Sequence, residues 1–501
     1  MVQLAPLLPL LPFALAANDP FKWHPCPGTR DPQLDCGALT VPLDHLNPNQ
    51  TIDIAVRRYR TTSLTPKGTI VFCPGGPGNT GVEAAGPKLL HSTGGQHHVV
   101  AFDPRGVGAS RPVKCTKNGF TGHQEAARLA AKDIPFDTDT SDTSLGRYGA
   151  EVQAQVRRCE KYDGAYLKTL STAYVARDLE AIRVALGADE LHYFAYSYGT
   201  AVGATYANMF PTRVGKFVLD SVVDPALYTG RTGETIMNYL VDAEAVFEGF
   251  AASCQAAGAL KCPLAAFATP EASVSTVVRS FLTNLDDAPR VVASTSDDFG
   301  ILSGANTRRL LGGAMYNPST WPQVSQYLAA LIAGQLPADG VPEVCLPSSS
   351  KRDAGMAGLV YIANDGDNHD GYVVDWDAAF LQSKAISPLA GPLWMANYLG
   401  LKYWTTTPTE RYDGPWNQKL KHRVLLLNNQ VDPVTPLAGA HHLAALMGDE
   451  NAILVTRDGF GHCTDNLPSR CMHDIVASFF NDAKYPPQDT NCVVDTEPFD
   501  G

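Results

Sequence analysis

Strand patterns alternate with helix patterns along much of this chain, and that alternation limits the possible folds more than any other feature. Short apolar runs typical of buried strands occupy residues 68–73, 98–102, 191–195 and 216–219, and residues 51–60 alternate as in a half-buried strand. Helical spacing occupies residues 173–186, which Gly187 ends, and the small-residue stretch 198–209. Strands that alternate with helices predict an α/β fold with a mostly parallel sheet and helices on both faces.

The alternation is interrupted between about residues 225 and 415, where helical segments such as 235–252 and 321–332 are separated by polar loops. It then resumes with strands at 423–427 and 452–456 and helices at 437–447 and 472–480. We therefore predict a core in two parts, 17–224 and 416–501, with a helical cap inserted at 225–415. Such a cap is expected above the carboxyl ends of the strands, where these sheets bind ligands.

Size and charge narrow the classes of partner. A chain of 501 residues is too long for one compact core, which agrees with an inserted cap. The formal net charge of -12 argues against nucleic acid and anionic membranes as partners. A monomer is expected, although composition does not decide the oligomeric state.

The first residues are interpreted as a secretory signal peptide spanning 1–16. An apolar run ends in Ala14-Leu15-Ala16, the small-x-small pattern of a cleavage site. Three prolines interrupt the run and no basic residue precedes it, so a disordered apolar tail remains the alternative. The run is too short to span a bilayer.

Eleven cysteines support an oxidising, extracellular location. Zinc binding is the alternative, but no CxxC pair or suitably spaced His accompanies them. Asn49 begins an Asn-Gln-Thr glycosylation sequon. Because Cys73 ends a strand just before a glycine-rich loop, we expect it to be the free, buried thiol. The remaining cysteines then give the pairs Cys26–Cys36, Cys254–Cys262, Cys115–Cys159, Cys471–Cys492 and Cys345–Cys463.

Ser197 lies in Ala195-Tyr196-Ser197-Tyr198-Gly199, between a buried strand and a small-residue helix. This is the context of a nucleophile elbow, whose usual pattern is G-x-S-x-G, here with Ala195 in place of the first Gly. An oxyanion hole needs two amides aimed at the developing negative charge. We expect them from Tyr198, which follows the nucleophile, and from Gly76 in the loop Pro74-Gly75-Gly76-Pro77-Gly78.

The acid and the base should follow the nucleophile in the order Ser, Asp, His. Asp432 follows the strand 423–427, and His462 follows the strand ending at Thr456, so both are predicted on loops at carboxyl ends of strands. His462 would take the proton of Ser197 while Asp432 orients the imidazole and stabilises its charge. This chemistry requires no cofactor and no metal.

Other motifs are interpreted structurally. Arg105, in Asp103-Pro104-Arg105-Gly106, is expected to join loops by an ion pair, and Ser110 to cap a turn. The pairs His97-His98 and His441-His442 are expected at the surface. Asp365-Gly366-Asp367 resembles half of a calcium loop but lacks the required Glu, so a solvated loop is expected.

With these motifs the chain resembles the secreted tripeptidyl aminopeptidases and, more distantly, the proline iminopeptidases, which are α/β-hydrolase serine peptidases. The resemblance rests on the proline-glycine loop at 74–78 and on the segments 103–110, 196–200, 219–220, 432–436 and 461–462. It implies release of short peptides from a free amino terminus, with acidic cap residues holding the ammonium group. Asp365 is the candidate for that role, although Ala363 and Leu401 stand where the family pattern has a cysteine pair.

The sequence thus predicts an extracellular exopeptidase that acts through an acyl-enzyme on a peptide or small ester substrate. An esterase, lactonase or biosynthetic hydrolase could use the same triad, because the cap decides the substrate. A catalytically dead binding protein is the alternative from another class, and the intact set of Ser, Asp, His and oxyanion loop argues against it.

Overall fold

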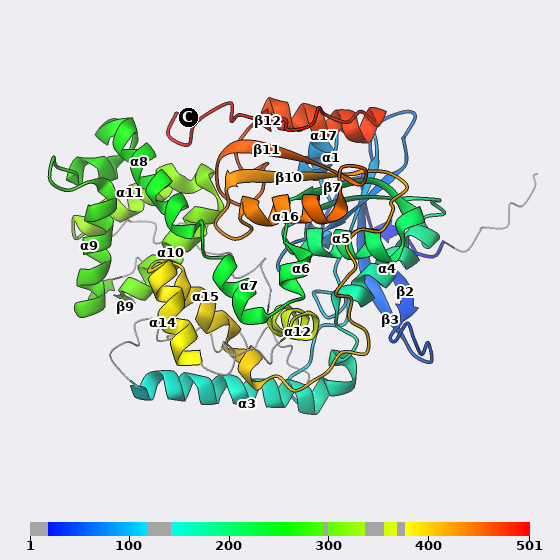
Figure 1. Cartoon of the computed structure of the whole chain (residues 1–501), viewed down its shortest axis with the longest axis horizontal. Helices are drawn as coiled ribbons and strands as arrows, with labels where there is room; N and C mark the ends of the chain where they lie inside the picture. Colours follow the sequence, from blue (N-terminus) through cyan, green and yellow to red (C-terminus); the bar gives the residue numbers. More distant parts are fainter. Residues whose placement is uncertain (1–18, 118–141, 294–298, 336–354, 368–375, 501) are drawn as a thin grey trace, which may run out of the picture.

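The computed structural model describes residues 19–117, 142–293, 299–335, 355–367 and 376–500 (Figure 1). Within them a ten-stranded sheet has the order β1-β2-β3-β5-β4-β6-β7-β10-β11-β12. The pairs from β1 to β5 in this order are antiparallel, and those from β5 to β12 are parallel. The strands are β1 (His24–Pro25), β2 (Leu34–Pro42), β3 (Thr51–Tyr59), β4 (Thr69–Cys73), β5 (His98–Phe102), β6 (Leu191–Tyr196), β7 (Val214–Asp220), β10 (Val424–Val431), β11 (Ala452–Phe460) and β12 (Asn491–Cys492).

Helices cover both faces of this sheet because its central strands are apolar on both sides. Val71 and Tyr193 belong to the core cluster shared with α4 (Thr172–Ala185), α5 (Tyr198–Met209) and α16 (Leu437–Met447). Phe72 and Phe194, one position along each strand, belong to the opposite cluster with α1 (Pro87–Ser92) and α17 (Arg470–Asp482). The predicted mostly parallel α/β sheet with two covered faces is confirmed (Figure 1).

A helical segment lies between β7 and β10, in the range predicted as the cap, and we call it the cap. It contains α6 (Pro225–Tyr228), α7 (Thr232–Asn238), α8 (Ala243–Lys261), α9 (Val274–Asp287), α10 (Gly304–Tyr316), α11 (Trp321–Ile332), α12 (Gly355–Asp365), α14 (Trp376–Ile386) and α15 (Gly391–Tyr398). The single helix expected at 235–252 is wrong, because the chain turns between α7 and α8. An antiparallel pair of strands, β8 (Arg290–Ala293) and β9 (Phe299–Leu302), also lies among the helices.

A long helix that precedes the nucleophile strand packs against the cap. This helix, α3 (Asp142–Leu167), runs along the lower edge of the view in Figure 1, below the cap helices α14 and α12. Glu160 accepts hydrogen bonds from the backbone and hydroxyl of Thr405, at 2.9 and 2.7 Å. The cap therefore rests on a helix that belongs to an earlier part of the chain.

Four of the five predicted disulfides are confirmed, namely Cys26–Cys36, Cys115–Cys159, Cys254–Cys262 and Cys471–Cys492. Cys73 is free and buried, as expected. The fifth pair is wrong, because Cys463 is a free thiol in the structure, while Cys345 lies outside the described residues. The Cys463 amide is held by the Ser221 hydroxyl at 2.7 Å, and burial raises the pKa of its thiol well above the ordinary range.

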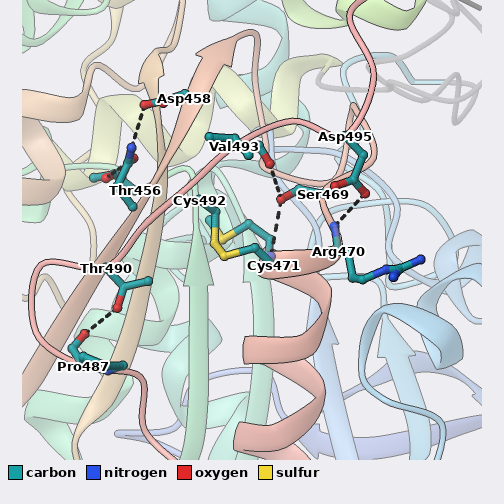
Figure 2. Close-up of a disulfide and its surroundings, with 12 residues drawn as sticks. Thr456, Asp458, Ser469, Arg470, Cys471, Pro487, Thr490, Cys492, Val493 and Asp495 are labelled. Carbon is teal, nitrogen blue, oxygen red and sulfur yellow. Dashed lines mark hydrogen bonds between the residues drawn. A yellow bond between two sulfur atoms is a disulfide. The ribbon is translucent and has the colours of Figure 1, made fainter.

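The end of the chain is fastened to the core before it reaches the cap. Figure 2 shows the Cys471–Cys492 disulfide between the first turn of α17 and β12, with the Ser469 hydroxyl donating to the Val493 carbonyl at 2.7 Å. Further along the chain, Phe499 packs against Phe250 of α8, with their ring centroids 6.4 Å apart.

Within the described residues, no helix combines the length and the apolar character needed to cross a membrane. The predicted signal segment 1–16 lies outside these residues. Asn49, the predicted glycosylation position, is exposed in the turn between β2 and β3.

Candidate active site

Ser197 occupies a strained turn between β6 and α5. Its backbone has φ 54° and ψ -126°, a left-handed conformation that costs energy for a residue other than glycine. Its side chain does not cap α5, although it holds the N-cap position. The turn thus presents a hydroxyl at the amino-terminal end of a helix, as the nucleophile elbow requires.

The glycine-rich loop after β4 lies against this turn. A Cβ added to Gly75 would meet the Ser197 Cβ at 2.8 Å, and one added to Gly199 would meet the Cys73 carbonyl oxygen at 2.7 Å. Glycine is needed at both positions because the backbones approach so closely. In the described part of the chain, the amides of Gly76 and Tyr198 have no protein acceptor, which leaves them for an oxyanion.

The predicted acid and base come together at the ends of neighbouring strands. Asp432 directly follows β10 and His462 follows β11, and these strands pair in parallel. The His462 Nδ1 lies 3.0 Å from both Asp432 carboxylate oxygens. The Asp432 side chain is fully buried, whereas that of His462 is 10% exposed. This pairing leaves the Nε2 edge of the ring for proton transfer.

Asp432 is ionised in this environment. Burial alone would raise the pKa of the Asp432 carboxyl, but the facing His462 and hydrogen bonds from Thr435 and Ser221 lower it below its ordinary value. The Val434 and Thr435 amides donate to Oδ1, each at 2.9 Å. A negative Asp432 can therefore stabilise an imidazolium on His462 during turnover.

The cap reaches His462, the predicted base, through Tyr316 at the end of α10. The His462 amide donates to the Tyr316 carbonyl at 2.8 Å, and the two rings lie edge to face with centroids 5.4 Å apart. Sequence reasoning missed this contact because nothing local to residues 304–316 points to a partner near His462.

Asp365 lies at the end of cap helix α12 and is 2% exposed. Its carboxylate accepts from the Thr172 amide at 2.9 Å, from the Thr172 hydroxyl at 2.7 Å and from the Tyr228 hydroxyl at 3.1 Å. The Thr172 hydroxyl lies 2.9 Å from the Tyr198 hydroxyl. Asp365 thus joins the cap to the residue that follows the nucleophile, and ammonium binding by Asp365 stays a prediction.

The remaining motifs have mixed outcomes. Arg105 and Asp178 form a fully buried ion pair at 2.7 Å, and the Ser110 hydroxyl donates to the Asp103 carbonyl, as expected. The surface position predicted for His97 is wrong. Its ring is buried, and burial lowers its pKa to about 3, so the side chain is neutral and packs inside the core. No group of three or more metal-ligating side chains occurs within the described residues.

Two family models match the two segments of the chain that carry the candidate site residues. A family model described as alpha/beta hydrolase fold matches residues 68–259, which include Ser197. A model described as TAP-like protein matches residues 387–492, which include Asp432 and His462.

The chain has the α/β-hydrolase fold.

This α/β hydrolase is similar over most of its length to several curated proteins. Serine protease Hip1 of Mycobacterium tuberculosis is 29% identical over 95% of this chain and 91% of its own. Tripeptidyl aminopeptidase of Streptomyces lividans is 26% identical over 97% and 89%. Carboxylesterase B of Mycobacterium tuberculosis is 27% identical over 91% and 86%. Together with the site geometry, these similarities identify the protein as a serine hydrolase.

Proposed function

We propose that this protein is a secreted serine exopeptidase that removes short peptides or amino acids from substrates with a free amino terminus. The observations that carry the proposal are the strained turn at Ser197 and the Asp432–His462 pair, whose facing atoms lie 3.0 Å apart. The names of the relatives, serine protease and tripeptidyl aminopeptidase, support a peptide substrate.

The geometry supports an acyl-transfer mechanism. His462 accepts the Ser197 hydroxyl proton while the Ser197 oxygen attacks the scissile carbonyl, and the amides of Gly76 and Tyr198 stabilise the oxyanion. The imidazolium then gives its proton to the leaving amine, which leaves an acyl-enzyme. Water, deprotonated by His462, hydrolyses this ester and regenerates Ser197.

The disulfides of this protein support export, because reducing compartments disfavour such bonds. Four disulfides occur within the described residues, and such bonds persist in oxidising environments. Asn49 is exposed, so glycosylation at its sequon is compatible with the fold.

The triad is tested by Ser197→Ala. We expect an intact fold and a fall in turnover of several orders of magnitude, since deleting a nucleophile removes the acyl-enzyme route. Circular dichroism checks the fold, and fluorophosphonate labelling of both proteins checks the nucleophile. A variant that keeps more than about a tenth of the wild-type rate would contradict the proposal.

Exopeptidase specificity is tested with matched peptides that differ only in amino-terminal acetylation. We expect cleavage of the free peptides and little cleavage of the acetylated ones. In Asp365→Asn, an ammonium-binding role predicts a raised KM for free peptides alone. A purely architectural role predicts equal losses on free peptides and on small esters.

An esterase is the second candidate, and the similarity to a protein named carboxylesterase B favours it. The same triad cleaves esters and amides. Equal rates on free and acetylated peptides, combined with faster cleavage of short-chain esters, would favour this candidate.

A further inference from the structure

Ser221 is a buried serine that the sequence analysis did not single out. It follows β7 directly, its side chain is fully inaccessible, and its φ of 58° is unusual for a residue other than glycine. Its amide donates to the Leu427 carbonyl of β10 at 2.9 Å. Backbone strain at a buried polar residue raises the question of what the hydroxyl does.

The Ser221 hydroxyl connects the two loops that carry the acid and the base. It lies 2.7 Å from Asp432 Oδ2, and it accepts the amide hydrogen of Cys463, the residue after His462, at 2.7 Å. An amide can only donate, so the hydroxyl oxygen is the acceptor of that bond. The one hydroxyl proton is then left for the ionised Asp432, which fixes the direction of the network.

Most other hydrogen-bond donors to Asp432 come from its own loop, whereas Ser221 comes from a different part of the chain. Val434 and Thr435 belong to the same loop as Asp432 and hold the carboxylate relative to its own turn. Within the described residues, Ser221 and His462 are the donors that reach Asp432 from outside that loop. A single oxygen atom, on the residue that follows β7, therefore contacts both the acid loop and the base loop.

We propose that Ser221 is a positioning residue of the catalytic site, which holds the Asp432 carboxylate against His462 and withdraws part of its negative charge. The proposal rests on the triad of the proposed function and not on the choice between peptide and ester substrates. It concerns a residue that acts through Asp432 and does not contact the reacting atoms.

Removal of the hydroxyl has two expected effects on the reaction. Without this donor the Asp432 carboxylate binds the imidazolium of His462 more strongly, so the acidic limb of the kcat/KM profile moves to higher pH. The loosened loops also lower kcat by about 10- to 100-fold, the range for a lost hydrogen bond to a charged group, with little change in KM.

Other groups that act on the acid and base must stay constant in this experiment. The titratable side chains around them include Asp242 at the start of α8, Arg457 of β11, Cys463 and Tyr316 of α10, together with Asp220 and Asp465, whose charges act on Cys463 and Arg457. None of these is changed by a substitution at Ser221, and a small activated ester avoids the ionisation of a substrate amine.

The test compares Ser221→Ala with Ser110→Ala as a matched control. Ser110 is also fully buried, accepts the Ala55 amide at 2.8 Å and donates to the Asp103 carbonyl at 2.7 Å, but it does not contact Asp432 or His462. We expect both variants to lose stability, and only Ser221→Ala to shift the acidic limb upward.

The proposal would be overturned if Ser221→Ala folds, keeps the acidic limb of its kcat/KM profile at the wild-type pH, and has a kcat no lower than that of Ser110→Ala. If Ser221→Ala does not fold, Ser221→Gly carries the test, because glycine relieves the positive φ while also lacking the hydroxyl. Ser197→Ala separates this failure from that of the proposed function. An inactive Ser197→Ala with a normal Ser221→Ala would reject the role of Ser221 alone, and an active Ser197→Ala would reject the triad.

Discussion

Three of the seven non-glycine residues with positive φ in the described residues lie at the candidate site. They are Ser197, Ser221 and Cys463, with φ of 54°, 58° and 74°; Ser197 is the proposed nucleophile, Ser221 contacts Asp432, and Cys463 follows His462. Such conformations persist only where the surroundings hold them in place, and the buried strand ends around the site provide that support. The strain is consistent with a site built to fix a few side chains in reactive positions.

Asp365 provides a prediction about pH and stability. Burial raises its pKa to about 6, so the folded protein keeps the proton to a higher pH than the unfolded chain does. Folding then takes up a proton between about pH 4 and pH 6. Stability falls as the pH rises through this window, by up to about 3 kcal/mol, and the loss is complete above it.

In Asp365→Asn this pH-dependent loss should disappear. Urea unfolding at pH 4.5, 6 and 7.5 is expected to show the variant gaining on the wild type as the pH rises. Asp367→Asn changes an exposed carboxyl two residues away and serves as the control. Parallel stability curves for wild type and Asp365→Asn would contradict the prediction.

The residues of the proposed triad could be named from sequence because each sits in a local context with its own signature. Ser197 follows a buried strand in an elbow motif, and Asp432 and His462 follow later strands in the expected order. Ser221 could not be found in this way, since its role depends on β7 lying beside β10 in the sheet. The burial of His97 was missed for the same reason, because a His in a loop carries no information about what covers it.

At the scale of elements, prediction succeeded where packing agrees with local pattern. The observed β5, α5, α11 and α16 have the predicted bounds, because apolar period and end signals coincide there. The helix expected at 235–252 failed because its apolar spacing continues through residues 239–242, where the chain turns instead. Tyr239 packs there with its ring 5.9 Å from that of Trp394 in α15, a long-range contact that no local pattern reveals.

The α5 helix supports a paired prediction about the oxyanion loop. A Cβ at Gly199 would meet the backbone oxygens of Cys73 and Pro74 at 2.7 and 2.9 Å, whereas one at Gly203 would meet side-chain atoms of Leu219 and Tyr193 at 2.6 and 2.7 Å. We expect Gly199→Ala to push the loop away from Ser197 and lower kcat at least about 10-fold, since a lost oxyanion donor costs that or more.

Gly203→Ala is the matched control in the same helix. Its added methyl displaces core side chains, so we expect a loss of about 1–3 kcal/mol in unfolding free energy with kcat retained. Hydrolysis of an activated ester measures kcat, and urea unfolding measures the free energy of unfolding. A wild-type kcat in Gly199→Ala would show that the loop tolerates displacement.

At the scale of the whole molecule, the core and the cap are joined at points far apart in sequence. Phe460, at the end of β11, packs with its ring 5.8 Å from that of Trp321 in α11, and Tyr316 contacts His462. Arg411, in the segment that leads back to the core, donates to the Asp365 carbonyl at 2.6 Å. The sequence predicted that a cap exists, but these joints depend on tertiary contacts and were not predicted.

The last residues of the chain form another such joint, and they support a prediction about cap stability. β12 pairs with β11 in the core, whereas Phe499 is 5% exposed and packs against Phe250 of α8 in the cap. The nearby Lys261–Asp500 pair is exposed on both sides and should contribute little. Phe499→Ala should therefore lower the free energy of unfolding by about 3 kcal/mol through lost packing.

Because the lost contact is on the cap, we expect KM for peptides to rise in Phe499→Ala while fluorophosphonate labelling of Ser197 persists. Leu260→Ala, which alters a fully exposed side chain of the same helix, is the control. Urea unfolding compares the stabilities of Phe499→Ala and Leu260→Ala. Equal stabilities would mean that the packing of Phe499 does not stabilise the cap.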